Sequence, residues 1–488
     1  MSSAPLDSTT IPGNLADLVK SVAGKESNRP TPTGFSLSKG GAIELAIAPV
    51  LGLYLGYAVG RLPEVFKSLN VPHLPMILML VFIAILGMAV PSDAWMQIWR
   101  RSRPLRLVAI LVALAFATIP TSFYPGGSLE YLRQRYMISL VIFLCCLVFL
   151  RDRRAFRRAI MIFVLCITAV AVNTVATYDP DAIQFDEDGE PIEFRADRAR
   201  VYVGSSLDPN DFGMILAATF PLALWLGVGS FRRRVFWGGC ALTLCAAVVP
   251  TASRGAMLAF AAAATALLGV GARGWRRVLT FFLIAAGVAL FVGLASGAQM
   301  GRFTNFSADD YNIEGNAGRW YFWKQGMVWM LKRPWGWGIS SFPLYFGEMN
   351  DGRERAAHSI WVQHGMELGV AGLVTFATLC AFMIRTLYRH RQVAIRLGGQ
   401  LAGAREEEAL ASHLIACLAA LLVAGTFLSI AYSPILYMAI GVAAAALLGS
   451  PLPESAFSRT DEPALPDSPV NRRRVAPQWT RQSQVLGK

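Results

Sequence analysis

The sequence predicts an all-α fold, a polytopic bundle of about twelve transmembrane helices, and two observations predict it. Of 488 residues, 54% are hydrophobic and 16% are charged, whereas about 25% of the residues of an ordinary soluble chain are charged. The apolar residues also form uninterrupted runs, such as Gly41–Gly60 and Ala256–Ala272. Their length is close to the roughly 20 residues that span a hydrocarbon core, so we expect these runs to be membrane helices.

The chain divides into a polar N-terminal tail, a membrane region and a polar C-terminal tail. Residues 1–40 and 450–488 have the Pro, Ser and charge bias of disordered segments. The first 40 residues contain no hydrophobic stretch, so no cleavable secretory signal is expected. Between residues 41 and 449, helices are expected at 41–60, 74–90, 107–121, 136–150, 159–176, 212–229, 235–252, 255–272, 278–297, 359–384, 414–429 and 432–449.

The distribution of Lys and Arg predicts the orientation of the bundle. If the N-terminus is inside, 30 of the 45 basic residues lie in inner segments and 15 in outer ones. Because cytoplasmic loops are enriched in Lys and Arg, both tails are expected in the cytoplasm. The two long outer connections are then Thr177–Asp211 and Ala298–Ala357, the second being a large periplasmic loop between helices nine and ten. Long loops of this kind often carry function.

Composition argues against three other classes of site or protein. The net charge of +13 is spread between helices, whereas a nucleic-acid-binding protein gathers it on one face. The seven cysteines all lie in apolar runs, which argues against a disulfide framework or a cysteine metal site. The helix interiors hold few ionisable residues, namely Glu44, His364 and Glu367, whereas ion-coupled transporters need such groups near the midplane.

Outward-facing arginines recur beside turn-forming residues. In RADRARVYVGSSLDPNDFG, Asn210 or Asp211 is expected to cap the next helix, which places Arg200 just above the membrane. In TASRGAML, Arg254 occupies a tight outer turn between two apolar helices. A lone Arg at that turn opposes the positive-inside bias, which favours a functional role. For Arg200, an interfacial side chain that reaches toward the headgroups is the plainer interpretation.

A Trp-rich segment follows at Gly315–Phe342. Five of the twelve tryptophans lie in it, which favours a short helix in the headgroup layer. The alternative is that these rings stack on sugars. Arg319 opens the segment after Gly-Asn-Ala-Gly, where it can project from a helix N-terminus toward an anion.

The tenth predicted helix begins with a His-Ser pair, His358 and Ser359. An ordinary His pKa of about 6.5 suits a general base near neutral pH, although a lone His at this depth can also be a headgroup contact. His364 is six residues on, about 240° around a helix, so the two do not share a face for a metal. Glu367 lies roughly 13 Å deeper, and a role in helix packing or in a cavity is favoured over a catalytic one.

In this order, the motifs resemble those of the bacterial O-antigen ligase/polymerase superfamily. They are Arg before Asp-Pro-Asn, Ser-Arg-Gly, Gly-Arg with a following Trp, Pro-x-x-x-Gly, and His-Ser with a downstream Glu-x-Gly-x-x-Gly. The resemblance extends from about Arg200 to Leu373 and agrees with a twelve-helix architecture. Its most specific element is His358–Ser359, which is similar to the His-Asn/Ser/Gln motif of the ligases.

The resemblance implies a metal-independent, inverting glycosyltransferase of cell-surface polysaccharide biosynthesis, either lipopolysaccharide or exopolysaccharide, with no cofactor. The donor is a glycan on undecaprenyl diphosphate, and the site faces the periplasm from the inner membrane. Arg254, Arg200 and Arg319 would bind the diphosphate, because guanidinium groups bind phosphate oxygens in a bidentate way. His358 would be the catalytic base. The supporting residues implied are Asn210, Ser359 and Glu367.

Several alternatives remain at this point. The acceptor could be lipid A core, as in a ligase, a second carrier-linked glycan, as in a polymerase, or a protein, as in an O-oligosaccharyltransferase. A flippase for lipid-linked sugars is a weaker alternative. Partners expected besides membrane lipids are a chain-length regulator or other polysaccharide-assembly proteins, and no nucleic acid. Arg195 and Arg198 compete with Arg200, which is chosen by its spacing alone, and the acidic run 185–193 has no role that the resemblance explains.

Overall fold

The computed structural model describes residues 40–71, 73–177, 208–251, 253–271, 281, 282, 285, 318–350, 352, 354–453, 456 and 457. Every regular element in these ranges is a helix. The helices are α2 (Gly40–Ala58), α3 (Leu62–Val65), η1 (Lys67–Leu69), α4 (Leu74–Ala89), α5 (Ser92–Arg101), α6 (Arg103–Thr118), α7 (Pro125–Tyr131), η2 (Leu132–Tyr136), α8 (Met137–Phe149), α9 (Arg153–Ala176), α10 (Pro209–Leu226), α11 (Phe231–Ala246), α12 (Val248–Thr251), α13 (Arg254–Ala266), η4 (Leu267–Gly271), α17 (Arg319–Lys332), α18 (Ser341–Met349), α19 (Ile360–Leu397), α20 (Ala404–Thr426) and α21 (Pro434–Leu448).

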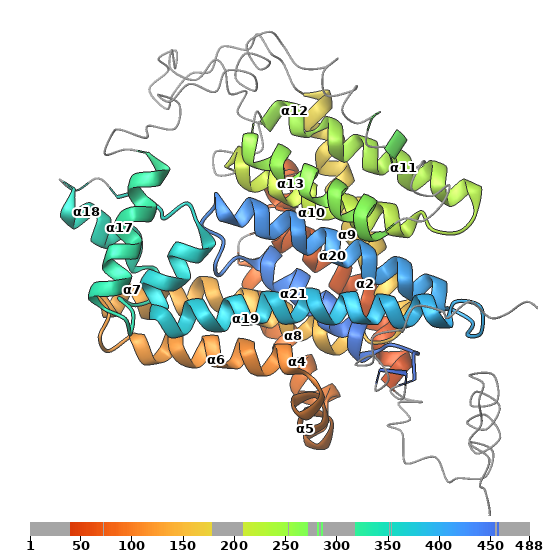
Figure 1. Ribbon diagram of the computed structural model, residues 1–488, viewed down its shortest axis with the longest axis horizontal. Coiled ribbons are helices and arrows are strands. Elements are labelled where there is room, and N and C mark those ends of the chain that lie inside the picture. The colour runs from red at the N-terminus through yellow and green to blue at the C-terminus, as the bar shows by residue number, and fades with distance from the viewer. Residues whose placement is uncertain are drawn as a thin grey trace, which may run out of the picture.

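The long helices pack side by side as a bundle, with α17 and α18 at one end of it (Figure 1). Helix α20 is central and packs against α19, α13, α10 and α21. Helix α2 packs on α9, α21 on α8, and α6 and α17 on α19. The core is built from apolar side chains on these helices, with Trp225, Tyr136 and Phe143 among the largest that are fully buried.

The described part of the chain is that of a multi-pass membrane protein. Five of its helices are long and apolar enough to cross a membrane, or six if the bent pair α4 and α5 counts as one span, and three shorter apolar helices accompany them. Eleven of the twelve predicted ranges are helical in this structure. The remaining range, 278–297, lies outside the described residues apart from three positions. The count of twelve spans therefore stays a prediction.

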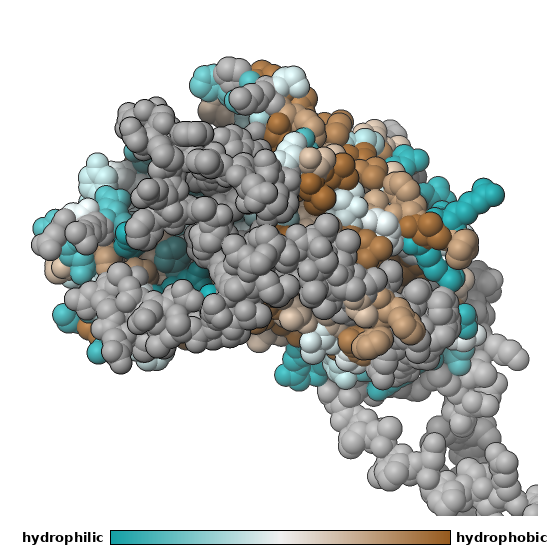
Figure 2. Space-filling view, turned by 90° about the horizontal axis from the view of Figure 1, so that it is seen from above, coloured by the Kyte–Doolittle hydropathy of each residue, from teal (hydrophilic) through white to brown (hydrophobic). Residues whose placement is uncertain are grey.

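Apolar side chains also cover the outside of the bundle. Leu53, Ile77, Leu80 and Val172 are about half exposed, and they lie on helices whose opposite faces are buried. On the face seen in Figure 2, hydrophobic residues gather between hydrophilic residues at the two ends. A lipid-facing belt explains this exposure, because side chains that contact acyl chains gain nothing by turning inward.

The two ends of the bundle differ, and we name each by one residue. The His358 end holds the last turn of α2, the first turns of α4, α10, α13 and α19, and the α20–α21 turn (Phe427–Ser433). The Glu407 end holds the other termini of these helices. Topology predicted from the positive charges places the His358 end outside.

The Glu407 end departs from the predicted helix boundaries. Helix α19 continues to Leu397 rather than residue 384, and α20 begins at Ala404 rather than 414. Hydropathy missed these turns because they are polar, yet they are packed. Glu407 accepts bonds from Arg153 (Nε–Oε1 2.6 Å) and lies 3.0 Å from Nε2 of His390. These contacts join the start of α20 to α9 through Arg153 and to α19 through His390, where apolar burial ends.

Candidate active site

The N-terminus of α10 is joined to that of α13 by one polar contact. Asp208 caps α10 and accepts a bond from the backbone N–H of Asn210 (2.8 Å), with Pro209 in the first turn. The amide oxygen of Asn210 then accepts the hydroxyl of Ser253 at 2.8 Å. The expectation that Asn210 or Asp211 is the cap is wrong, because Asp208 fills that place and releases both for other contacts.

Arg254 is the first residue of α13. Ser253, which precedes it, caps the helix by accepting a bond from the backbone N–H of Ala256 at 3.2 Å. The cap and the Asn210 contact fix the backbone of Arg254 beside α10, and its side chain is half-buried. Gly213 allows this approach, because a Cβ there would overlap Ala256 of α13.

His358 lies just before α19, in a left-handed backbone conformation with φ 46°. Two contacts hold it there: its N–H donates to the hydroxyl of Ser429 (2.8 Å), and its carbonyl accepts the indole N–H of Trp323 (3.2 Å). Such a conformation costs about 1–3 kcal/mol in a residue other than glycine, and it is concentrated at functional sites. Ser359, the buried N-cap of α19, accepts the N–H of Gln363 through its carbonyl at 2.9 Å.

The imidazole of His358 is biased toward its neutral form. Burial lowers its pKa below the ordinary 6.5, and the positive charge of Arg319 lowers it further, while Asp208 raises it and Arg355 lowers it slightly. A neutral imidazole has a free nitrogen lone pair to accept a proton. The side chain therefore has the protonation state that a general base needs near pH 7.

Arg319 opens α17, and its guanidinium lies 6.0 Å from the centre of the Phe427 ring. Phe427 belongs to the α20–α21 turn, as does Ser429, which binds His358. The electrostatic influence of both Arg319 and Asp208 on His358 places three elements around this imidazole: the start of α17, the start of α10 and the start of α19.

The α20–α21 turn joins these parts, and no motif in the sequence pointed to it. Besides Ser429 with His358, the N–H of Ala431 donates to the side-chain amide of Gln363 (3.2 Å), and the indole of Trp361 donates to Thr426 (3.2 Å). The sequence signal was weak, because FLSIAYSP reads as an ordinary connection between two helices.

The Pro-x-x-x-Gly and Glu-x-Gly motifs form a single structural unit, which we call the clasp (Pro334–Gly338 with Met366–Val370). Helix α19 is broken at Gly369, where φ is 74° and ψ is −174°. The segment Pro334–Gly338 pairs with the break through three backbone bonds: Trp337 N–H to Met366 C=O (3.0 Å), Gly338 N–H to Glu367 C=O (2.9 Å), and Val370 N–H to Pro334 C=O (2.8 Å). The clasp thus satisfies groups that the break would leave unpaired in an apolar setting.

Glu367 supports this unit rather than the imidazole. Its side chain is fully buried and accepts the backbone N–H of Phe342, in the first turn of α18, at 3.4 Å. A carboxylate at a helix N-terminus interacts favourably with the free N–H groups there. This contact supports the packing interpretation.

The tryptophans of this region form a core between α17, α18 and α19. Trp329 is buried against Tyr345 and Phe342, and Trp337 donates its indole N–H to the carbonyl of Trp329 (2.8 Å). Trp320 and Trp335 are more than half exposed. Their exposure is compatible with both predicted roles, an anchor in the headgroup layer and a surface that stacks on sugars.

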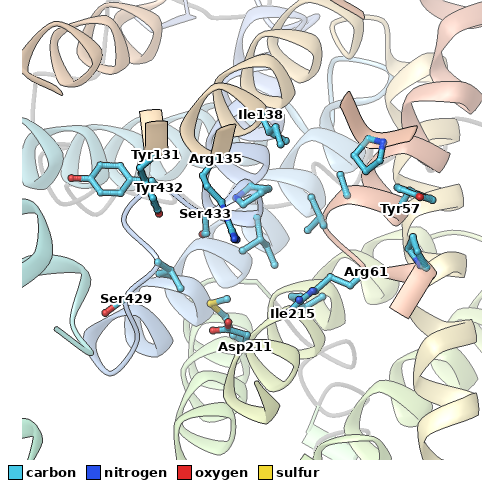
Figure 3. A pocket seen from close by; sticks show the side chains of 18 of the residues that line it. Tyr57, Arg61, Tyr131, Arg135, Ile138, Asp211, Ile215, Ser429, Tyr432 and Ser433 are labelled. Atoms are coloured by element: carbon cyan, nitrogen blue, oxygen red, sulfur yellow. The ribbon is translucent and has the colours of Figure 1, made fainter. Parts of the chain in front are cut away.

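A cavity of about 620 Å³ adjoins this region at the His358 end (Figure 3). Ser429, which binds His358, is one of its lining residues. Arg61, Arg135 and Asp211 also line it, from α2's end, η2 and α10. Sequence reasoning singled out neither arginine and treated Asp211 only as a possible helix cap, because the three residues lie on segments that are far apart in the chain.

Arg200 and the acidic run 185–193 lie outside the described residues, as do residues 298–317 of the large predicted loop. Across the described part of the chain, no three His, Cys, Asp or Glu side chains are grouped as metal ligands. The predicted site residues that the structure describes lie at helix starts: His358 and Ser359 before α19, Arg319 at the start of α17, Asn210 at the start of α10 and Arg254 at the start of α13.

The fold and site define a class: a multi-pass helical membrane protein with basic residues and a neutral histidine at one end. Residues 239–377 match a protein family described as O-antigen ligase. This match supports the resemblance to the O-antigen ligase/polymerase superfamily that the motifs indicated, and its description implies glycosyltransferase-type activity. The match contains Arg254, Arg319, His358 and Glu367, but not Arg200 or Asn210. No curated protein matches the chain.

Proposed function

We propose that this protein transfers a glycan from undecaprenyl diphosphate to an acceptor hydroxyl, at the His358 end, on the periplasmic side of the inner membrane. The observation that carries the proposal is the environment of His358: a half-buried imidazole kept neutral beside Arg319, at the end of the bundle where Arg254 begins α13. The family match over 239–377 supports the reaction class.

The proposed step is a single displacement. The acceptor O–H gives its proton to the imidazole of His358 as the oxygen bonds to the anomeric carbon, and the bond from that carbon to the diphosphate oxygen breaks. The leaving diphosphate takes the electron pair and gains negative charge, so guanidinium groups that contact it stabilise the transition state more than the ground state. Arg254 and Arg319 are the described residues proposed for this, with Arg200 as a third. One displacement inverts the anomeric configuration.

The acceptor distinguishes three activities that share this donor site. A ligase transfers finished polysaccharide to lipid A core, a polymerase joins carrier-linked repeat units, and an oligosaccharyltransferase glycosylates protein. A flippase is disfavoured because buried acidic side chains such as Glu44 and Glu407 lie near helix ends and are paired there, with Arg151 (3.0 Å) and Arg153 (2.6 Å).

The test is complementation of a deletion strain, with surface glycan and membrane-inserted protein measured together. We expect His358→Ala and Arg254→Ala to abolish surface glycan at unchanged protein level, because removal of a general base alone costs about 10²–10⁴ in rate. Matched controls at or toward the Glu407 end are His413→Gln and Arg154→Ala, of which Arg154 is exposed. If both test variants retain full activity, this mechanism is wrong.

A further inference from the structure

The cavity of about 620 Å³ shares one residue, Ser429, with the surroundings of His358. It is enclosed by the end of α2, the start of α4, the α7–η2 segment, the start of α10 and the α20–α21 turn. Ser429 belongs to both sites, because its hydroxyl accepts the His358 N–H and its side chain lines the cavity. The cavity therefore lies beside the backbone of His358, across Ser429, and Arg254 and Arg319 are not part of its lining.

The charges in the cavity are predominantly positive. Figure 3 shows Arg135 and Arg61 extending into it from two sides, with Asp211 on a third. Asp211 and Arg61 interact electrostatically, so the negative charge of Asp211 offsets the positive charge of Arg61. Arg135 makes no hydrogen bond or ion pair with any described residue and interacts only electrostatically with Tyr131. One guanidinium is thus available to a ligand.

The backbone at both arginines is unusual, and it directs them to this space. Arg135 lies in the π-turn η2 (Leu132–Tyr136), inserted between α7 and α8, and π-turns of this kind are frequent at functional sites. Arg61 is in the left-handed region, with φ 54°, between α2 and α3. A left-handed conformation in a residue other than glycine persists where the surroundings hold it.

The remaining lining residues suit a sugar. Hydroxyl or amide groups come from Tyr57, Asn70, Ser429 and Ser433, which can exchange hydrogen bonds with sugar hydroxyls. Aromatic rings of Tyr131 and other tyrosines contribute flat apolar surface. The volume is within the roughly 300–1,000 Å³ of small-ligand sites, enough for one or two sugar rings.

We propose that this cavity binds the acceptor sugar through an anionic group, a carboxylate or a phosphate, that pairs with Arg135. The proposal rests on the glycosyl-transfer function above and adds the chemical class of its acceptor. Donor and acceptor must approach His358 from different sides. With Arg254 and Arg319 assigned to the donor, the cavity beyond Ser429 offers the acceptor a separate approach to His358 among the described residues.

The experiment is ligand titration of the purified full chain in lipid nanodiscs. The anionic probes are hyaluronan tetrasaccharide, which carries carboxylates, and glucose 6-phosphate; the neutral partners are chitotetraose and glucose. We expect at least one anionic probe to bind about tenfold more tightly than its neutral partner, which is the size of effect that a charge-assisted hydrogen bond gives. Which probe is preferred identifies the acceptor's group.

Arg135→Gln should remove this preference and Arg135→Lys should restore part of it. Arg133→Gln is the matched control, because Arg133 is exposed like Arg135 and lies on the same turn but does not line the cavity. The proposal is overturned if no anionic probe is preferred over its neutral partner, or if the preference survives Arg135→Gln. It is also overturned if inorganic pyrophosphate binds more tightly than both anionic sugar probes and depends on Arg135 in the same way, since the cavity would then belong to the donor.

His358→Ala separates this proposal from the one on which it rests. We expect the variant to bind the probes normally and to have no transfer activity. Normal probe binding in an active His358→Ala variant would refute the mechanism and leave the cavity's ligand class intact. Absence of any anionic preference, with His358→Ala inactive, would refute the cavity's assignment alone.

Discussion

Replacement of Gly369 by alanine should destabilise the protein severely. At φ 74° and ψ −174°, this residue lies in a region open essentially to glycine, and another residue there costs about 1–3 kcal/mol. The new Cβ would also overlap the carbonyl oxygen of Pro334 and lie 2.6 Å from the carbonyl carbon of Trp335. The clasp would have to move, with loss of its three backbone bonds at about 0.5–1.5 kcal/mol each. Together these effects amount to about 2.5–7.5 kcal/mol.

The assay is unfolding of the purified protein by SDS in mixed micelles, followed by tryptophan fluorescence. Gly239→Ala is the control, because Gly239 lies inside α11 with nothing within 4 Å of the added Cβ. It should leave stability unchanged or raise it, since alanine is the better helix former. An ordinary substitution changes the free energy of unfolding by about 1 kcal/mol. If the free energy of unfolding of Gly369→Ala is within that range of the wild-type value, the clasp does not hold α19 as described.

Two further predictions concern the chemistry. Because neutral His358 is the active form, kcat/KM should fall as pH falls through the pKa of His358, which is below 6.5. Arg319→Gln removes a positive charge and should move this acid limb of the pH profile to higher pH. Asp208→Asn removes a negative charge and should move the acid limb to lower pH. If the acid limb lies at the wild-type pH in both variants, it does not report the protonation of His358. Transfer activity should persist in excess chelator, because arginines are proposed to neutralise the diphosphate, and a loss rescued by magnesium would contradict that role.

The sequence was sufficient for the elements that depend on local pattern. Apolar runs located eleven helices that the structure contains, and Arg254, Arg319 and His358 stood out because charged or titratable residues at such helix ends are conspicuous. The role of each in catalysis stays a prediction.

Features that depend on contacts between distant segments could not be read from the pattern. Arg135 and Asp211 are separated in the chain by helices α8 and α9 and by residues 177–208, and both line the folded cavity. The clasp could not be predicted, because nothing local indicates that Pro334–Gly338 pairs with a break in α19. The extra turns of α19 and α20 were missed because the pairing of Glu407 with Arg153 compensates for their polarity.

The same limit applies to caps. Asp208, Asn210 and Asp211 are all good capping residues, and the choice among them depends on where Pro209 fixes the first turn and on what Ser253 requires. The predicted cap, Asn210 or Asp211, was wrong, because Asp208 precedes Pro209 at the first helical position and takes that place.

The central claim is that glycan leaves its lipid carrier at the His358 end. Its most direct test is the amount and size of carrier-linked glycan in cells that lack the gene and are complemented with wild type or His358→Ala. We expect glycan to accumulate on the periplasmic side in the deletion strain and in the His358→Ala strain, as long polymer if the protein is a ligase or as single repeat units if it is a polymerase. Carrier-linked glycan at wild-type level in the His358→Ala strain, or accumulation confined to the cytoplasmic side, would contradict the claim.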